Sequence, residues 1–331
     1  MALLEIKNLS TEFVTEQGRV QAVRDVSITL NQGEVLGIVG ESGSGKSQTM
    51  FSLMGLLADN GEVTEGTITF DGKDISRTKF KNKREYEKVM RSIRGNTMSM
   101  IFQDPMTFLN QVLKIETQLV EPLMNHKKIS RAEAKKVALD LMRKVGIPSP
   151  EKRISQYPFE FSGGMRQRII IAIALACNPK LIIADEPTTA LDVTIQAQVL
   201  ELIDSLREES SSSIIMITHD LGVVAKLCDR VAIMYGGKIV EIGTDQEIFY
   251  DPKHPYTLGL LSCIANPEDD LVEELHPIPG SPPDLLNPPK GCPFVDRCEK
   301  AMRICKDHMP DNTVFSDTHQ CRCWLNHEKA V

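Results

Sequence analysis

Residues Gly40–Ser47 read GESGSGKS, and this stretch decides the fold. It fits the pattern G-x-x-x-x-G-K-S of a phosphate-binding loop, in which glycines let consecutive backbone N–H groups turn toward phosphate oxygens. The apolar stretch EVLGIV precedes it and an apolar helical stretch follows, so the positive end of a helix adds to the field. The alternative, a glycine-rich turn that binds no ligand, would not need a strand before it and a helix after it. We therefore predict a nucleotide site in which Lys46 reaches the β- and γ-phosphates and the Ser47 hydroxyl ligates Mg²⁺.

Strand and helix patterns alternate on both sides of this loop. Apolar or alternating runs punctuated by glycine predict strands at 4–9, 20–30, 34–39 and 66–71. Residues 181–250 alternate between strands and helices, including a helix over Val193–Ser210, whereas 112–178 are mostly helical by periodicity. The apolar run Ile169–Cys177 predicts a buried helix within that region. The fold class is therefore α/β, with a mainly parallel sheet covered by helices.

The composition is that of a folded globular protein, with 41% hydrophobic and 25% charged residues over 331 positions. The net charge of −7 argues against a general nucleic-acid binder. No apolar stretch is long enough to cross a bilayer, and the first residues lack the pattern of a signal peptide, so we expect a cytoplasmic location. Residues 77–94 are dense in Lys, Arg and Glu. A phosphate or lipid patch is one interpretation, but Glu85 and Glu87 interrupt the basic run and favour a solvated helix face.

Two further motifs suit a nucleotide site. The buried strand LIIAD ends at Asp185, which would hold Mg²⁺ through water, and Glu186 would polarise the attacking water. Without the phosphate loop, solvated acids at a strand end would be the simpler interpretation. The sequence Ser162-Gly163-Gly164 opens a helix and is a second anion-binding N-terminus. Two anion sites in one chain predict either two ligands or a dimer in which one chain's Ser-Gly-Gly closes on the other's phosphate loop.

The order of motifs over residues 1–250 resembles the ATPase subunit of ABC transporters. The motifs are GESGSGKS, IFQDP around Gln103, SGGMRQR, LIIADEP, TALD at 189–192 and ITHD around His219. The resemblance implies a phosphate-loop ATPase domain over 1–250, with a helical subdomain at about 104–178. It also implies a head-to-tail dimer with two ATP molecules at its interface, each between one subunit's phosphate loop and the other's Ser-Gly-Gly signature.

The resemblance also assigns roles residue by residue. Glu186 would be the catalytic base, His219 would touch the γ-phosphate, and Gln103 would reach Mg²⁺ and the attacking water. Mg²⁺ would be held by Ser47, Gln103 and Asp185. ATP would contact Phe13 through its adenine, and otherwise Gly40, Glu41, Ser42, Gly43, Ser44, Gly45, Lys46, Ser47, Gln48, Asp185, Ser162, Gly163, Gly164, Gln167 and Asp192. A strand-end Phe is usually a core residue, and a lone His after a strand is usually structural, so Phe13 and His219 depend on the motif context alone.

Other stretches narrow the resemblance to the D-type subunit of peptide permeases. These stretches are GKSQT with LMGLL, IFQDPMT, HPYT at 254–257, and PIPGSPPDLLNPPKGCPF. The sequence departs from that family at Phe108 and Gln111, where Ser and Pro are usual, and at Phe161, where Leu is usual. The first departure could alter the contact with the membrane subunit, and the second should be mild.

This narrower resemblance implies a motor for peptide import, peripheral to the cell membrane on its cytoplasmic side. Its partners would be a second ATPase subunit (a paralogue), two membrane-spanning permease subunits and an extracellular peptide-binding protein, with no nucleic acid. Motion would pass to the membrane subunits through residues 103–113. The alternatives are the same machinery importing nickel or another small solute, and a soluble ABC-type ATPase that acts on ribosomes or DNA.

Five of the eight cysteines lie at the end of a Pro-rich stretch, 276–293, or after it, within a predicted C-terminal extension, 251–331. The other three, Cys177, Cys228 and Cys263, lie in apolar or helical contexts and are predicted core residues. The five lack the C-x2-C pairs of zinc ribbons and the ferredoxin run, so their spacing predicts a metal site with the metal left open. Inert cysteines, a zinc knuckle and a redox sensor remain alternatives. The family resemblance implies a [4Fe–4S] cluster on Cys292, Cys298, Cys305 and Cys323, with Cys323 preferred to Cys321 because Cys-Trp-Leu matches the family ending.

Overall fold

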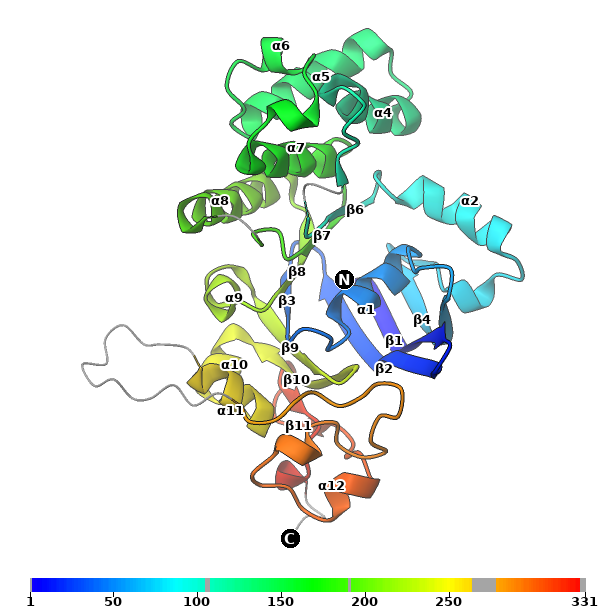
Figure 1. The fold of residues 1–331 in the computed structure, drawn as a ribbon, viewed down its shortest axis with the longest axis vertical. Helices are drawn as coiled ribbons and strands as arrows, with labels where there is room; N and C mark the ends of the chain where they lie inside the picture. The colour runs from blue at the N-terminus through cyan, green and yellow to red at the C-terminus, as the bar shows by residue number, and fades with distance from the viewer. Residues whose placement is uncertain (1, 105–107, 190–191, 264–277, 328–331) are drawn as a thin grey trace, which may run out of the picture. The chain divides into compact units, whose positions relative to one another are not determined.

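The structure is a computed structural model that describes residues 2–104, 108–189, 192–263 and 278–327. Its described residues divide into two compact units (Figure 1). The sheet-rich unit comprises Ala2–Leu30, Val35–Lys81 and the described part of Ile217–Val331, and the helix-rich unit comprises Asn31–Glu34 and the described part of Asn82–Met216. The chain passes from one unit to the other within strand β8 (Ser213–Thr218).

The sheet-rich unit contains an antiparallel sheet that the sequence patterns did not predict. Its strands β1 (Ala2–Thr15), β2 (Gly18–Asn31), β4 (Gly61–Phe70) and β5 (Lys73–Asp74) are ordered β2-β1-β4-β5. Strand β1 pairs antiparallel with β4, from Leu4 opposite Phe70 to Phe13 opposite Gly61. The prediction of a mainly parallel sheet therefore holds only for other strands, because periodicity shows where a strand is and not which strand it pairs with.

A second group of strands in the same unit is ordered β11-β12-β10-β9-β3. Strand β3 (Val35–Val39) is buried at every residue and pairs in parallel with β9 (Arg230–Tyr235), as expected for a strand covered on both faces. Strand β10 (Lys238–Thr244) pairs antiparallel with both β9 and β12 (Gln320–Cys321), and β12 pairs with β11 (Thr313–Val314). Residues from the C-terminal extension therefore join the sheet.

Helices cover these strands and position the loops between them. Helix α1 (Lys46–Met54) contacts β1, α9 (Leu221–Leu227) contacts β3, and α10 (Asp245–Tyr250) contacts β9 and β10. Helix α11 (Pro255–Ser262) and the short α12 (Ile304–Asp307) follow later in the chain. Described residues of the Pro-rich stretch lie against β2, where the Gln21 N–H donates to the Leu285 carbonyl at 2.8 Å. Residues 276 and 277 of that predicted linker lie outside the described residues.

The helix-rich unit gathers α4 (Ile115–Lys127), α5 (Arg131–Lys144) and α7 (Gly163–Leu175) side by side (Figure 1). Helix α5 begins with a capping box between Ser130 and Glu133, which satisfies two otherwise orphaned N–H groups. Helix α6 (Pro150–Arg153) lies between α5 and α7 in sequence. Helix α7 buries Ile169, Ile170 and Ile171, which confirms the predicted buried helix.

The same unit holds parallel strands β6 (Met98–Ile101) and β7 (Leu181–Asp185), with Met98 opposite Leu181. Helix α8 (Val193–Ser210) begins and ends where the sequence predicted. Helix α2 (Lys83–Ile93) buries only Tyr86, Met90 and Ile93, which confirms the solvated helix face predicted in the charged stretch. No helix in the described ranges is long and apolar enough to cross a membrane.

Candidate functional site

The predicted nucleotide-binding residues divide between the two units. The phosphate loop lies in the sheet-rich unit, between β3 and α1, as its sequence context predicted. Gly45 caps α1 with a φ of 101°, and Gly43 has a φ of 79°, conformations that side chains other than glycine's rarely adopt. The loop closes on itself through the Ser44 N–H, which donates to the Glu41 carbonyl at 3.2 Å.

Two glycines of this loop have no room for a side chain. A Cβ on Gly40 would lie 2.1 Å from the Met234 carbonyl oxygen, and a Cβ on Gly45 would lie 2.4 Å from the Ala22 carbonyl oxygen. A bond from the Gly237 N–H to the Ser44 carbonyl, 3.0 Å long, further joins the loop to the β9–β10 turn. The loop is therefore held rigidly by β2 and β9, which pre-orders its N–H groups for a ligand.

Lys46 and Ser44 provide the polar atoms of the loop. The Lys46 Nζ donates to the carbonyls of Gly40 at 2.6 Å and Glu41 at 3.0 Å, which directs the ammonium back over the loop. The Ser44 hydroxyl is buried without a hydrogen-bond partner within the described residues. An orphaned buried hydroxyl beside a lysine and a glycine-rich turn fits a phosphate ligand, because such a ligand would give that hydroxyl a partner.

The two predicted acids lie at the end of strand β7 of the helix-rich unit, Asp185 as its last residue and Glu186 directly after it. Asp185 is 3% exposed, and Glu186 follows with a φ of 44°, an uncommon conformation for a residue with a side chain. The Gln103 Nε2 donates to Glu186 Oε2 at 2.8 Å, and the Thr189 hydroxyl donates to the same oxygen at 2.9 Å. The structure therefore brings Gln103 and Glu186 together and fixes the direction of the Glu186 carboxylate.

The predicted signature lies at the start of α7 in the same unit. Ser162 caps the helix, with its hydroxyl accepting from the Met165 N–H at 3.4 Å. A Cβ on Gly163 would meet nothing within 4 Å, so this helix start is open, whereas a Cβ on Gly164 would lie 2.9 Å from Ile195. Gln167 is buried, and its amide donates to the Pro187 carbonyl at 2.6 Å, which ties the signature helix to the turn after β7.

Three other predicted residues lie on separate elements. Asp192 caps α8, where its carboxylate accepts from the Ile195 N–H at 3.0 Å. His219 is exposed after β8 in the sheet-rich unit, and Phe13 lies partly buried on β1 opposite Gly61. Ala190 and Leu191 of the TALD motif, and Thr107 of the segment after Gln103, lie outside the described residues.

The three departures from the family pattern have distinct surroundings. Phe108 stacks on Phe102 with ring centroids 4.6 Å apart, and the Gln111 amide donates to the Leu109 carbonyl at 3.0 Å. Phe161 is buried, with the Arg153 guanidinium 5.9 Å from its ring centroid. An aromatic side chain at position 161 is therefore part of the packed core beneath the signature.

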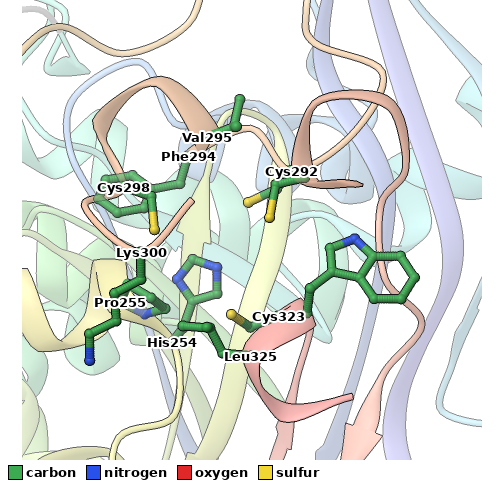
Figure 2. A pocket seen from close by; sticks show the side chains of 11 residues that line it. His254, Pro255, Cys292, Phe294, Val295, Cys298, Lys300, Cys323 and Leu325 are labelled. Atoms are coloured by element: carbon green, nitrogen blue, oxygen red, sulfur yellow. The ribbon is translucent and has the colours of Figure 1, made fainter. Parts of the chain in front are cut away.

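The prediction of an iron–sulfur cluster is wrong. The predicted cysteines line a cavity of about 20 Å³, and Figure 2 shows Cys292, Cys298 and Cys323 with their sulfurs turned toward it. That volume holds roughly one water molecule. Among the described residues, no group of three or more His, Cys, Asp or Glu side chains could hold a metal ion. Burial raises the pKa of Cys292 to about 12 and that of Cys323 to about 11. Sequence spacing predicted a common location but not the chemistry.

Residues far along the chain contact the phosphate loop, and the motif analysis did not identify them as partners. The Glu41 N–H donates to the Tyr256 hydroxyl at 2.9 Å, and the Arg297 Nη1 donates to Glu41 Oε2 at 2.7 Å. Tyr256 belongs to the HPYT motif, so the sequence did mark this position, although only as a family feature. Nothing in the sequence marked Arg297.

Comparison with known proteins supports the motif analysis. Residues 23–189 match the protein-family model described as ABC transporter, and residues 240–305 match the one described as oligopeptide/dipeptide transporter, C-terminal region. The chain is 55% identical to the oligopeptide transport ATP-binding protein OppD of Bacillus subtilis (strain 168), covering 99% of this chain and 90% of that protein. It is 53% identical to the dipeptide transport ATP-binding protein DppD of the same strain, covering 99% and 96%.

Among solved structures, the chain resembles the dimeric structure of a post-hydrolysis state of the ATP-binding cassette MJ0796, bound to ADP and phosphate. The TM-score is 0.63 at 26% identity, covering 73% of this chain and 98% of that one.

Proposed function

Because the chain belongs to the ABC transporter family, we propose that it is the ATP-binding and hydrolysing subunit of an importer of oligopeptides or dipeptides. The similarity of residues 240–305 to the C-terminal region of peptide transporters favours peptides over nickel or another small solute. The similarity over 99% of the chain to transport ATP-binding proteins favours this role over a soluble ATPase that acts on ribosomes or DNA.

In this proposal the phosphate loop binds the triphosphate of ATP. The loop's backbone N–H groups face the phosphates, except those of Glu41 and Ser44, which donate within the protein. Lys46 exchanges its bonds to the Gly40 and Glu41 carbonyls for phosphate oxygens. The orphaned Ser44 hydroxyl donates to the same ligand. Phe13 stacks on the adenine. The rigid glycine packing at Gly40 and Gly45 supports this assignment, because a preorganised loop loses little conformational entropy when it binds its ligand.

Hydrolysis depends on the pair held after β7. Glu186 aligns and polarises the attacking water, and the bonds from Gln103 and Thr189 hold its carboxylate in one orientation. Ser47, Gln103 and Asp185 would hold Mg²⁺, which when bound neutralises charge on the phosphate oxygens. His219 contacts the γ-phosphate.

We propose that two such subunits form the working ATPase, with a paralogue as the second. The open helix start at Ser162-Gly163-Gly164 would close on the partner's nucleotide, supported by Gln167. Asp192 would lie at the seam between the two subunits. Two membrane-spanning permease subunits and an extracellular peptide-binding protein complete the proposed importer.

The contact between Gln103 and Glu186 is the observation that carries this proposal. Gln103 begins the segment that we expect to meet the permease subunits, and the same side chain is bonded to the proposed catalytic base. Apolar side chains follow it on the surface, including Val112, which is 78% exposed, and Phe108 and Leu113. Exposed apolar side chains close together in sequence suit a protein interface, so the chain would be peripheral on the cytoplasmic face of the cell membrane.

We also propose that residues 1–250 form the ATPase domain, with the helical subdomain at about 104–178. Residues 251–331 would then form a C-terminal extension specific to peptide importers, which the matched region 240–305 supports.

Glu186→Gln in the reconstituted importer tests this function. The amide preserves the shape of the side chain but cannot polarise water, so we expect nucleotide binding to persist while ATP turnover and peptide uptake fall at least about a hundredfold. Uptake of labelled peptide into vesicles and phosphate release are measured together, with Glu151→Gln on the exposed surface of the same unit as the control. Turnover at the wild-type rate in Glu186→Gln would reject Glu186 as the base.

A further inference from the structure

Arg297 is the centre of a hydrogen-bond cluster beneath the phosphate loop. Its side chain is 6% exposed and makes four hydrogen bonds within the sheet-rich unit. Nη1 donates to Glu41 Oε2 at 2.7 Å and to the Tyr235 hydroxyl at 3.0 Å. Nε donates to the Pro279 carbonyl at 2.8 Å, and Nη2 donates to the Ile278 carbonyl at 3.1 Å. A buried guanidinium with this many partners has one orientation, and that orientation points at the loop.

Aromatic rings fix the position of this guanidinium. Its carbon lies 5.7 Å from the Tyr235 ring centroid and 5.9 Å from that of Phe294. Tyr235 and Tyr256 have ring centroids 4.5 Å apart, and each also contacts the Phe294 ring. These rings bring together β9, α11 and the short helical turn Val295–Arg297. The cluster is therefore rigid as well as polar.

Glu41 is held by this cluster at two of its atoms. Its carboxylate accepts from Arg297, and its N–H donates to the Tyr256 hydroxyl at 2.9 Å. Glu41 is also the second residue of the loop, and its carbonyl accepts from Lys46 Nζ and from the Ser44 N–H. A displacement of Glu41 would therefore move both polar groups that we expect to contact phosphate.

The charge of Glu41 makes the contact with Arg297 necessary. A carboxylate within a phosphate-binding loop repels an anionic ligand unless a cation neutralises it. Arg297 supplies that cation in a well-oriented, largely buried pair, where charge-assisted hydrogen bonds are strong. Burial by itself lowers the pKa of Arg297, but its bonds to Glu41 and Tyr235 outweigh this and raise the pKa, so the guanidinium stays charged.

We infer that Arg297 is a positioning residue for nucleotide binding: by neutralising and holding Glu41, it lets the C-terminal extension set the affinity of the phosphate loop for ATP. This inference rests on the proposed role of that loop. Arg297 does not touch the nucleotide; it acts through Glu41. The C-terminal extension therefore contributes to ATP binding within this chain, in addition to any contact with partners.

A double-mutant cycle on the full-length chain tests the inference, with the dissociation constant of MgATP measured by calorimetry. Arg297→Ala leaves the Glu41 carboxylate unpaired beside the ligand, and we expect affinity to fall about tenfold. In the double variant Arg297→Ala, Glu41→Gln the repelling charge is gone, so most of that loss should be recovered. Arg297→Lys keeps the charge but loses the planar fork, so we expect a smaller loss.

Arg322→Ala is the matched control. Its guanidinium also joins the C-terminal extension to the body of the unit, through a 2.9 Å bond to Asp25, but it makes no hydrogen bond to the phosphate loop in the described chain. We expect this variant to bind MgATP within twofold of the wild type. Thermal unfolding of every variant shows whether the fold is intact.

Two outcomes would overturn the inference. One is unchanged affinity in Arg297→Ala, and the other is a loss that remains fully in the double variant, because Arg297 would then support only the fold. Lys46→Ala separates this result from the proposed function itself. If Lys46→Ala abolishes MgATP binding while Arg297→Ala does not weaken it, only the inference about Arg297 fails; if Lys46→Ala binds normally, the phosphate-loop assignment fails.

Discussion

Replacing Glu241, the carboxylate on β10, should destabilise the sheet-rich unit by several kcal/mol. Glu241 lies on β10 next to a shift in register, and its side chain is buried. Its two oxygens accept four hydrogen bonds, from the backbone N–H groups of Lys253 at 2.6 Å and His254 at 3.0 Å, the Thr257 hydroxyl at 2.5 Å and His319 Nε2 at 2.8 Å. These donors belong to the segment before α11, to α11 itself and to the segment before β12.

The expected magnitude follows from these bonds. Glu241→Ala leaves four buried donors without an acceptor, and breaking a buried pair of this kind costs about 3–5 kcal/mol. The unfolding entropy of a chain of this length is roughly 0.7 kcal/mol/K, so the melting temperature should fall by about 4–7 °C. The melting temperature of Glu241→Gln should fall by less than that of Glu241→Ala, because one oxygen remains as an acceptor while the new amide group faces donors.

Thermal unfolding followed by circular dichroism measures this difference, with Glu12→Ala as the control. Within the part of the chain that the structure describes, the Glu12 side chain makes only an ion pair with the exposed Arg19, so its loss should change the free energy of unfolding by less than about 1 kcal/mol. If Glu241→Ala melts within 1 °C of the wild type, the bonds to Glu241 do not hold the C-terminal extension, and the reasoning from burial fails.

Two further substitutions probe other contacts. Burial by itself would raise the pKa of Glu247, but hydrogen bonds from Ser316, Thr244 and Thr318 outweigh it and lower this pKa to about 2. The ionised Glu247 therefore stabilises the fold fully at pH values above its ordinary pKa of 4.5. That stabilisation is lost as the pH falls from about 4.5 to about 2. Glu247→Gln should flatten the decline in unfolding free energy over this window, and a denaturation series showing the same decline in both proteins would contradict the assignment. Gly40→Ala places a methyl group against the Met234 carbonyl, so MgATP affinity should fall at least about tenfold in a calorimetric titration. The methyl group of Gly163→Ala meets nothing within 4 Å, so this variant should melt near the wild-type temperature.

The elements that the sequence predicted best are those whose signals are local. Helix α8 begins at Val193 because Asp192 caps it, and an N-cap side chain is visible in the sequence. Strand β7 is a run of five buried residues that ends at Asp185, with Glu186 directly after it, and both the burial and the acids can be predicted from the sequence. The phosphate loop likewise combines its glycines, lysine and helix start within eight residues.

What could not be predicted depends on contacts between distant residues. Arg297 and Glu41 are 256 positions apart, and no pattern of spacing links them. Glu241 reads as a solvent-facing residue in an alternating strand, yet a register shift accompanies its burial. The prediction of an iron–sulfur cluster was wrong for a related reason. The spacing of the cysteines predicted that their sulfurs lie close together, but the volume of the cavity between them and the burial of the thiols are tertiary properties.

Strand β12 also has a consequence for self-association. On one side β10 pairs with β9, and on the other its residues Glu241 and Ile242 pair with the two residues of β12. Without β12, that side of β10 would present unpaired N–H and C=O groups, which are a template for strands of other molecules. Strand β11, which pairs with β12 beyond it, is only two residues long, and such a short strand is a poor template. Strands β11 and β12 therefore protect the edge of β10 from aggregation, and a protein shortened before residue 313 would expose an edge on which copies could stack.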